Sequence, residues 1–112
     1  GAVYGNDGSN ALFGGEAVFA NNTAVFGGAI CSINNSELNF AGEASVSLFN
    51  NYAGYAGGAI LLYNQSDFGS YGTASLASNK AKYGGAVFVH KDSTASFGGK
   101  IVFANNTAEK NG

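Results

Sequence analysis

Short stretches rich in apolar residues recur along the chain and are separated by Gly and Asn. Segments 16–20 (EAVFA) and 100–104 (KIVFA) are two examples, and each repeat unit carries several Gly. Helical repeats would need apolar residues at i, i+3 and i+4 together with good helix formers. The pattern therefore predicts two or three short strands per unit, broken by Gly and Asn turns.

The strands belong to a repeat whose units begin at residues 1, 28, 58 and 85. A Gly-Gly-Ala motif followed by Ile or Val opens these units, and the chain itself starts inside it with Gly1-Ala2-Val3. Complete copies are Gly27-Gly28-Ala29-Ile30, Gly57-Gly58-Ala59-Ile60 and Gly84-Gly85-Ala86-Val87. Later columns hold Ser (Ser9, Ser36, Ser66, Ser93) and Gly (Gly15, Gly42, Gly72, Gly99). Such self-similarity identifies a repeat architecture.

Each unit also holds Phe or Leu, two residues, and then Asn. The pairs are Phe19 with Asn22, Leu48 with Asn51, Leu76 with Asn79, and Phe103 with Asn106. Units of this length with several strands predict one coil each of an all-β, right-handed parallel β-helix, or β-solenoid. The coils are 1–27, 28–57, 58–84 and 85–112. We expect one solenoid segment of a longer array.

Residues in one column should stack about 4.8 Å apart along the axis. Three ladders follow: aliphatic Val3, Ile30, Ile60 and Val87; aromatic Phe13, Phe40 and Phe97; and amide Asn22, Asn51, Asn79 and Asn106. Ser70 and Tyr71 interrupt the aromatic ladder in the third coil. Stacked amides can bond one another where strand pairing lapses. A two-residue insertion between Gly42 and Leu48 predicts a bulge in the second coil.

The pairing of Gly-Gly-Ala-(Ile/Val) with Phe-x-x-Asn resembles the repeats of the chlamydial polymorphic membrane proteins. The resemblance covers all four units, although Leu replaces Phe at Leu48 and Leu76. It implies a β-helical passenger of an autotransporter that acts as a surface adhesin. The membrane-embedded translocation domain of such proteins has no counterpart among these residues.

Composition narrows the function. Nine Phe, six Tyr and 46% hydrophobic residues argue against disorder. The chain has five basic residues, all Lys, and a net charge of -2. This charge balance predicts no basic surface for binding nucleic acid or an anionic membrane. No apolar run approaches the ~20 residues that span a bilayer. The single Cys31 excludes an internal disulfide framework.

Two pairs of carboxylates are candidates for Ca²⁺ binding or an acid/base dyad. Glu37 and Asp67 share one column, and Glu16 and Glu43 are expected to share another. The alternative is an outward-facing, solvated pair. Polysaccharide-cleaving β-helices need clustered carboxylates beside Lys or Arg. With seven carboxylates and no Arg, no catalytic residue, metal ligand or cofactor site is predicted.

The remaining candidate side chains have structural alternatives. His90 has no second His, and Cys31 shares a column with Tyr4, Leu61 and Phe88, which indicates a small core or sheet residue. Five tyrosines are candidates for a sugar-binding face or for the packing of turns. They are Tyr52, Tyr55, Tyr63, Tyr71 and Tyr83.

N-glycosylation sequons occur at Asn21, Asn34, Asn64 and Asn105. Asn34 and Asn64 occupy one column and are expected to face solvent. Asn21 and Asn105 precede ladder asparagines and should point outward if the ladder points inward. The alternative is that a chain rich in Asn, Ser and Thr generates sequons by accident.

The last residues of the sequence, followed by its first residues, would continue the repeat without a break. Asn111-Gly112 followed by another Gly1-Ala2-Val3 would restore the Gly-Gly-Ala-Val motif, and residues 103–108 repeat residues 19–24 word for word. We therefore expect further copies stacked head to tail, with Gly112 against a following Gly1.

Three functions remain: a filament or stalk repeat, an adhesin passenger, and a carbohydrate-binding or carbohydrate-cleaving β-helix. We expect a non-catalytic, extracellular structural repeat at a cell surface. Its expected partners are copies of itself and glycans, with no cofactor, no nucleic acid and no membrane span in this segment.

Overall fold

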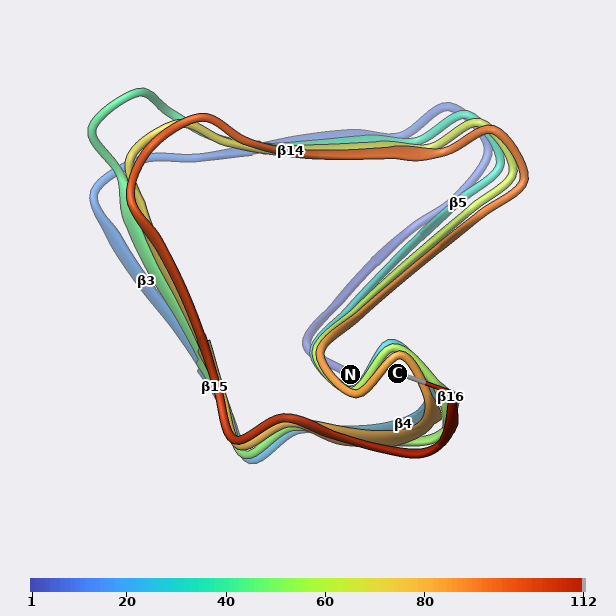
Figure 1. Ribbon diagram of the computed structural model, residues 1–112. Helices are drawn as coiled ribbons and strands as arrows, with labels where there is room; N and C mark the ends of the chain where they lie inside the picture. The colour runs from blue at the N-terminus through green and yellow to red at the C-terminus, as the bar shows by residue number, and fades with distance from the viewer. Residues whose placement is uncertain (112) are drawn as a thin grey trace.

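The chain winds into a right-handed parallel β-solenoid, which confirms the predicted fold class. The computed structural model describes residues 1–111 and contains strands without any helix among them. In Figure 1 the path from the fainter blue end to the red end runs counter-clockwise as it approaches the viewer, which is the right-handed sense. The expected junction of Gly112 with Gly1 lies outside the described residues.

Each coil contributes one strand to each of four parallel sheets, so the expectation of two or three strands per coil is wrong. The first sheet comprises β1 (Val3–Gly5), β5 (Ile30–Ile33), β9 (Ile60–Tyr63) and β13 (Val87–His90). The second comprises β2 (Asn10–Phe13), β6 (Glu37–Phe40), β10 (Asp67–Ser70) and β14 (Thr94–Phe97). The third comprises β3 (Glu16–Ala20), β7 (Ser45–Phe49), β11 (Thr73–Ala77) and β15 (Ile101–Ala104). The fourth comprises β4 (Thr23–Phe26), β8 (Tyr52–Ala56), β12 (Lys80–Tyr83) and β16 (Thr107–Asn111).

The aliphatic ladder has the predicted register. Ile30 pairs with both Val3 and Ile60, and Val87 follows Ile60 in the same column. Ile30 and Ile60 are fully buried, whereas Val3 and Val87 on the outer coils are partly buried against the same core. Apolar burial in the middle coils therefore anchors the fold.

The aromatic ladder continues through the coil where the sequence interrupts it. Ser70 pairs with Phe40 and Phe97, as its column predicts. The ring of Phe68, two residues earlier on β10, lies 5.7 Å from that of Phe40 and 5.5 Å from that of Phe97. Phe68 thus fills the space that Ser70 leaves, because both side chains point into the core.

The asparagine ladder forms a continuous chain of amide hydrogen bonds. Asn51 Nδ2 donates to Asn79 Oδ1 at 3.0 Å and to the carbonyl of Phe19 at 3.0 Å. Asn79 Nδ2 donates in turn to Asn106 Oδ1 and to the carbonyl of Leu48. Each side chain therefore satisfies backbone groups at the corner between the third and fourth sheets, where strand pairing lapses.

We expect Asn79→Ala to lower the free energy of unfolding by about 3 kcal/mol, because it leaves several buried groups without partners. Asn79 is fully buried, and its Oδ1 accepts from both the backbone N–H and Nδ2 of Asn51. Urea unfolding followed by circular dichroism measures the change. Asn39→Ala is the control, since the Asn39 amide bonds only the exposed Glu37 carboxylate. Equal losses in the two variants would contradict a special role for the ladder.

Left-handed backbone conformations at two corners explain the choice of turn residues. Between the first and second sheets two successive residues have positive φ in every coil. These pairs are Asp7–Gly8, Asn34–Asn35, Asn64–Gln65 and Lys91–Asp92. The corner before the asparagine ladder places Asn21, Asn50, Ser78 and Asn105 at φ between 55° and 60°. Asn tolerates this conformation better than most residues, which accounts for much of the Asn content.

The serine column, which sequence reasoning left without a role, forms another ladder beside the first of these corners. The backbone N–H of Ser36 donates to Ser66 Oγ at 3.2 Å, and that of Ser66 donates to Ser93 Oγ at 3.0 Å. Ser36 and Ser66 are buried. Their hydroxyls satisfy backbone donors at a point where the chain bends away from strand pairing.

The insertion in the second coil forms the predicted bulge but changes the register of one column. The loop between β6 and β7 projects at the upper left of Figure 1, and the Ala44 N–H donates to the Ala41 carbonyl within it. Glu16 pairs with Ser45, so the expectation that Glu16 and Glu43 share a column is wrong. The inserted residues precede Ser45, which carries Gly42 and Glu43 out of the stack.

Candidate functional site

The fourth and first sheets meet at a re-entrant corner that the Gly-Gly-Ala motif builds. Gly27, Gly57 and Gly84 have φ between 59° and 69°, which turns the chain inward. The next glycine in each motif lies against the backbone of the neighbouring coil, where a side chain has no room. Figure 1 shows the backbone turning inward between β4 and β5 at this corner.

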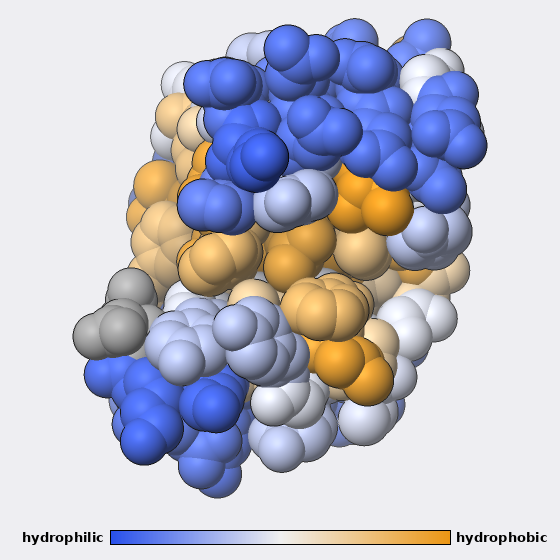
Figure 2. Space-filling view, turned by 90° about the vertical axis from the view of Figure 1, so that its right-hand side faces the viewer, coloured by the Kyte–Doolittle hydropathy of each residue, from blue (hydrophilic) through white to orange (hydrophobic). Residues whose placement is uncertain are grey.

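The re-entrant corner holds an apolar groove that runs along the solenoid axis, and we call it the corner groove. Figure 2 shows a hydrophobic band between two hydrophilic margins on this face of the molecule. The groove has a volume of about 540 Å³. Its lining residues are Tyr4, Phe26, Cys31, Ile33, Tyr55, Ala56, Leu61, Tyr63, Phe88 and His90.

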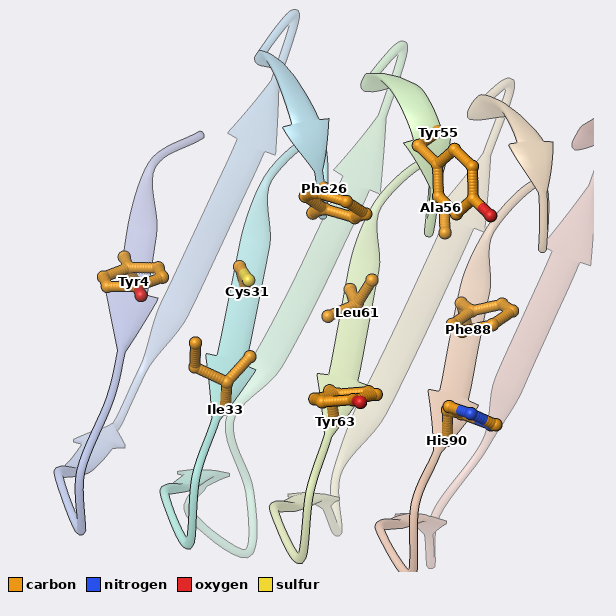
Figure 3. Close-up of a pocket in the computed structure, with 10 residues that line it drawn as sticks. All are labelled: Tyr4, Phe26, Cys31, Ile33, Tyr55, Ala56, Leu61, Tyr63, Phe88 and His90. Atoms are coloured by element: carbon orange, nitrogen blue, oxygen red, sulfur yellow. The ribbon is translucent and has the colours of Figure 1, made fainter.

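One wall is the outer face of the first sheet. Strand pairing stacks Tyr4, Cys31, Leu61 and Phe88 in one column, as predicted. Two residues further along each strand a second column holds Ile33, Tyr63 and His90. Both columns project into the groove in Figure 3. The imidazole of His90 stacks on the ring of Tyr63 at a centroid distance of 5.6 Å.

The opposite wall is a column of aromatic rings on the fourth sheet, packed edge to face. The ring of Tyr55 lies 5.4 Å from that of Phe26 and 5.1 Å from that of Tyr83. Lys82 Nζ lies 5.8 Å from the centroid of the Tyr55 ring and 5.6 Å from that of Tyr83. An ammonium group so placed is attracted by both rings. It puts a positive charge beside Tyr55, which lines the groove.

Of the two placements expected for Cys31, in the core or in the sheet, the structure shows the second. Cys31 lies on β5, and its side chain faces the groove. It is a half-buried free thiol, and burial raises the pKa of Cys31 above its ordinary value. The thiolate is the reactive form, so the folded chain should hold less of it at a given pH than the unfolded chain.

We accordingly expect iodoacetamide to alkylate Cys31 at least several-fold more slowly in the folded chain than in concentrated guanidinium chloride at about pH 8. Mass spectrometry of quenched samples gives both rates. A small thiol compound in the same two solutions controls for the effect of the denaturant on the reagent. Equal rates in the folded and unfolded chain would contradict the raised pKa.

The other candidate side chains are spread over separate faces. Glu37 and Asp67 do pair across β6 and β10, and both are exposed. Asn10 and Thr94 flank them in the same column, without a cation. No cluster of three or more His, Cys, Asp or Glu able to hold a metal ion occurs in residues 1–111. No helix in that range is suited to cross a membrane.

The five tyrosines do not form one face. Tyr55 and Tyr63 line the corner groove, and Tyr83 packs edge-on against Tyr55. Tyr71 lies instead at the corner between the second and third sheets, and Tyr52 is exposed at the start of β8. Sequence reasoning treated these tyrosines, His90 and the Cys31 column separately. Two columns beside the Gly-Gly-Ala motif were the signal that links them: an aromatic residue one or two positions before it (Phe26, Tyr55, Tyr83) and the second residue after it (Cys31, Leu61, Phe88).

All four sequon asparagines lie at left-handed φ, between 55° and 60°. Asn21 and Asn105 are exposed. Asn34 and Asn64 are only half exposed, because they form a second amide ladder: Asn64 Nδ2 donates to Asn34 Oδ1 at 2.7 Å, and Asn34 Nδ2 donates to Asn6 Oδ1 at 2.8 Å. The backbone and this ladder give each Asn a structural reason to be present.

Comparison with known proteins supports the resemblance drawn from the motifs. Residues 16–33 match the family described as the Chlamydia polymorphic membrane protein repeat. This segment contains β3, β4 and β5, and therefore one asparagine of the ladder and one complete re-entrant corner. Neither the comparison with curated proteins nor that with solved structures finds a matching relative.

Proposed function

We propose that this chain is a non-catalytic, extracellular β-solenoid segment of a surface protein, and that it extends by end-to-end stacking of further coils. The observation that carries the proposal is the pair of open faces at the two ends of the stack. Strands β1–β4 and β13–β16 are the edge strands of their sheets. Unpaired edges of this kind invite further pairing.

The outermost coil also displays core residues. Phe103 stands in the inward column of Phe19, Leu48 and Leu76, yet it is 52% exposed, whereas Leu48 and Leu76 are fully buried. Another coil placed above β15 would bury it. The matched repeat family, whose name describes membrane proteins, supports a location at a cell surface. Glu37 and Asp67, the carboxylates that stacking pairs, are exposed and are flanked in their column by Asn10 and Thr94, which supports a non-catalytic role.

Sedimentation measurements test stacking with a matched pair of variants. Phe103 and Val102 are adjacent on β15 and similarly exposed, but Phe103 belongs to the inward column and Val102 to the outward face. Phe103→Lys should abolish self-association by placing a charge on the stacking face. Val102→Lys should leave it intact. A wild-type chain that stays monomeric, or equal effects of the two variants, would contradict end-to-end stacking.

Glycans remain part of the proposal at Asn21 and Asn105, where the side chains are exposed. Asn34 and Asn64 are poorer acceptors, since adjacent coils lie only about 4.8 Å apart and their amides bond one another. In material from a eukaryotic secretory host, we expect glycopeptide mass spectrometry to find sugars on Asn21 and Asn105. Joint occupancy of Asn34 and Asn64 would contradict this assignment.

A further inference from the structure

We propose that the corner groove binds the hydrocarbon chain of a medium-chain fatty acid, with the carboxylate of the ligand beside Lys82. The groove has the volume and the mainly apolar lining that small-molecule sites have, at about 540 Å³. Its walls are preformed, because strand pairing and the glycine corners fix both of them. A ligand therefore meets a rigid surface and does not have to order it.

The chemistry of the lining selects a hydrocarbon chain over a sugar or a peptide. The polar side-chain atoms of the lining are the hydroxyls of three tyrosines, the thiol of Cys31 and the ring nitrogens of His90. Sugar hydroxyls or peptide amides placed along Leu61 and Phe88 would lose their hydrogen bonds to water without replacement. A hydrocarbon chain has no such bonds to lose.

The shape of the groove is that of a chain-like ligand. Its lining extends from Tyr4 on β1 to Phe88 on β13, which is three coil spacings, or roughly 14 Å. Over this length the columns present flat rings, aliphatic side chains and the thiol of Cys31. An extended acyl chain can lie along them without a fixed register, whereas a peptide strand has a different repeat distance along its axis.

Charge complementarity places the head group. Lys82 Nζ lies over the ring of Tyr55, which is itself part of the lining. The lysine is half-buried, so part of its hydration is already lost. A carboxylate beside Lys82 would gain a charged hydrogen bond while its chain follows the groove. A cationic head on the same chain would be repelled.

Isothermal titration calorimetry with dodecanoate, below its micelle concentration, tests the proposal. We expect saturable binding with one site per chain and a negative heat-capacity change. Leu61→Gln should weaken binding about tenfold or more, because it places an amide in the groove. Leu61 is 5% exposed, so circular dichroism must first show that this variant is folded. Leu12→Gln, on the exposed face of β2, controls for the same substitution away from the groove and should leave binding unchanged.

A second pair of variants tests whether Lys82 selects a ligand with a negatively charged head group. Lys82→Gln should weaken dodecanoate binding roughly three- to fivefold and should remove the preference over dodecyltrimethylammonium. Lys80→Gln, on the same strand, should change neither. In the wild-type chain, bound dodecanoate should also slow the alkylation of Cys31, which lines the groove. The rate of Cys31 alkylation is measured on the wild-type chain, so it does not depend on whether a variant folds.

Three results would overturn the proposal. The first is absence of dodecanoate binding to a chain whose circular dichroism shows it folded. The second is binding that Leu61→Gln and Leu12→Gln weaken equally, or that leaves the alkylation of Cys31 unchanged. The third is displacement of dodecanoate by an apolar peptide that binds more tightly, which would assign the groove to a protein partner.

Discussion

Ile60→Asp should prevent the chain from folding at neutral pH. Ile60 is fully buried in the middle of the aliphatic ladder, between Ile30 and Val87. A carboxylate there has no partner, and burying an unpaired charge costs several kcal/mol in addition to the lost apolar burial. The total stability of a small domain is only about 5–15 kcal/mol. Ile30, equally buried, should behave in the same way on substitution by Asp.

Circular dichroism and thermal unfolding measure this effect. Leu12→Asp is the matched control, because Leu12 is 75% exposed on the outward face of β2. The control should shift the melting temperature by a small amount, whereas Ile60→Asp should remove the cooperative transition. An unchanged melting temperature for Ile60→Asp would show that its column faces solvent and that the assignment of inside and outside is wrong.

The ladders could be predicted from the sequence because stacking places the same chemistry at the same position in every coil. Ile30 over Ile60 and Asn51 over Asn79 are examples in which the column alone gave the contact. The continuity of the aromatic ladder could not be predicted in this way, because the ring in the third coil comes from a different position on the strand. Phe68 substitutes for the ring missing at Ser70 from another position on the same strand, which a column-by-column comparison does not reveal.

The corner groove could not be predicted because concavity depends on backbone angles and not on residue type alone. Gly57 is compatible with either sign of φ. Its positive value turns β8 towards β9 and brings Tyr55 and Leu61 to facing walls. The number of strands was missed for a related reason. The fourth strand of the second coil, YAGYA, contains a Gly and does not alternate clearly between apolar and polar residues.

The sequons illustrate a limit of motif reading in a repeat protein. The Asn of each sequon lies at a left-handed corner position, and Ser36 and Ser66 belong to the buried serine ladder. Stacking requirements therefore generate Asn-x-Ser in two adjacent coils at the same place. Identical spacing in two coils is therefore evidence of shared structure. Only in the sequons that begin at Asn21 and Asn105 are both the Asn and the Thr exposed.

Gly58→Ala should destabilise the chain by about 4 kcal/mol or more, although it adds a single methyl group. The φ of Gly58 is not positive, so the obstacle is steric. A Cβ there would overlap the carbonyl oxygen of Gly85 and would lie 2.7 Å from the backbone nitrogen of Lys80. Both obstacles are backbone atoms of the next coil, which cannot rotate away as a side chain would.

The coils would have to separate, which strains the hydrogen bonds from Gly58 N–H to the Gly84 carbonyl and from Ala59 N–H to the Ala86 carbonyl. Gly42→Ala is the matched control, since a Cβ at Gly42 meets nothing within 4 Å and its φ is not positive. That substitution should be neutral or slightly stabilising, because Ala restricts the unfolded chain. Urea unfolding of the two variants compares them directly. Similar stabilities would show that the second glycine of the motif does not require close approach between coils, and that the re-entrant corner has another cause.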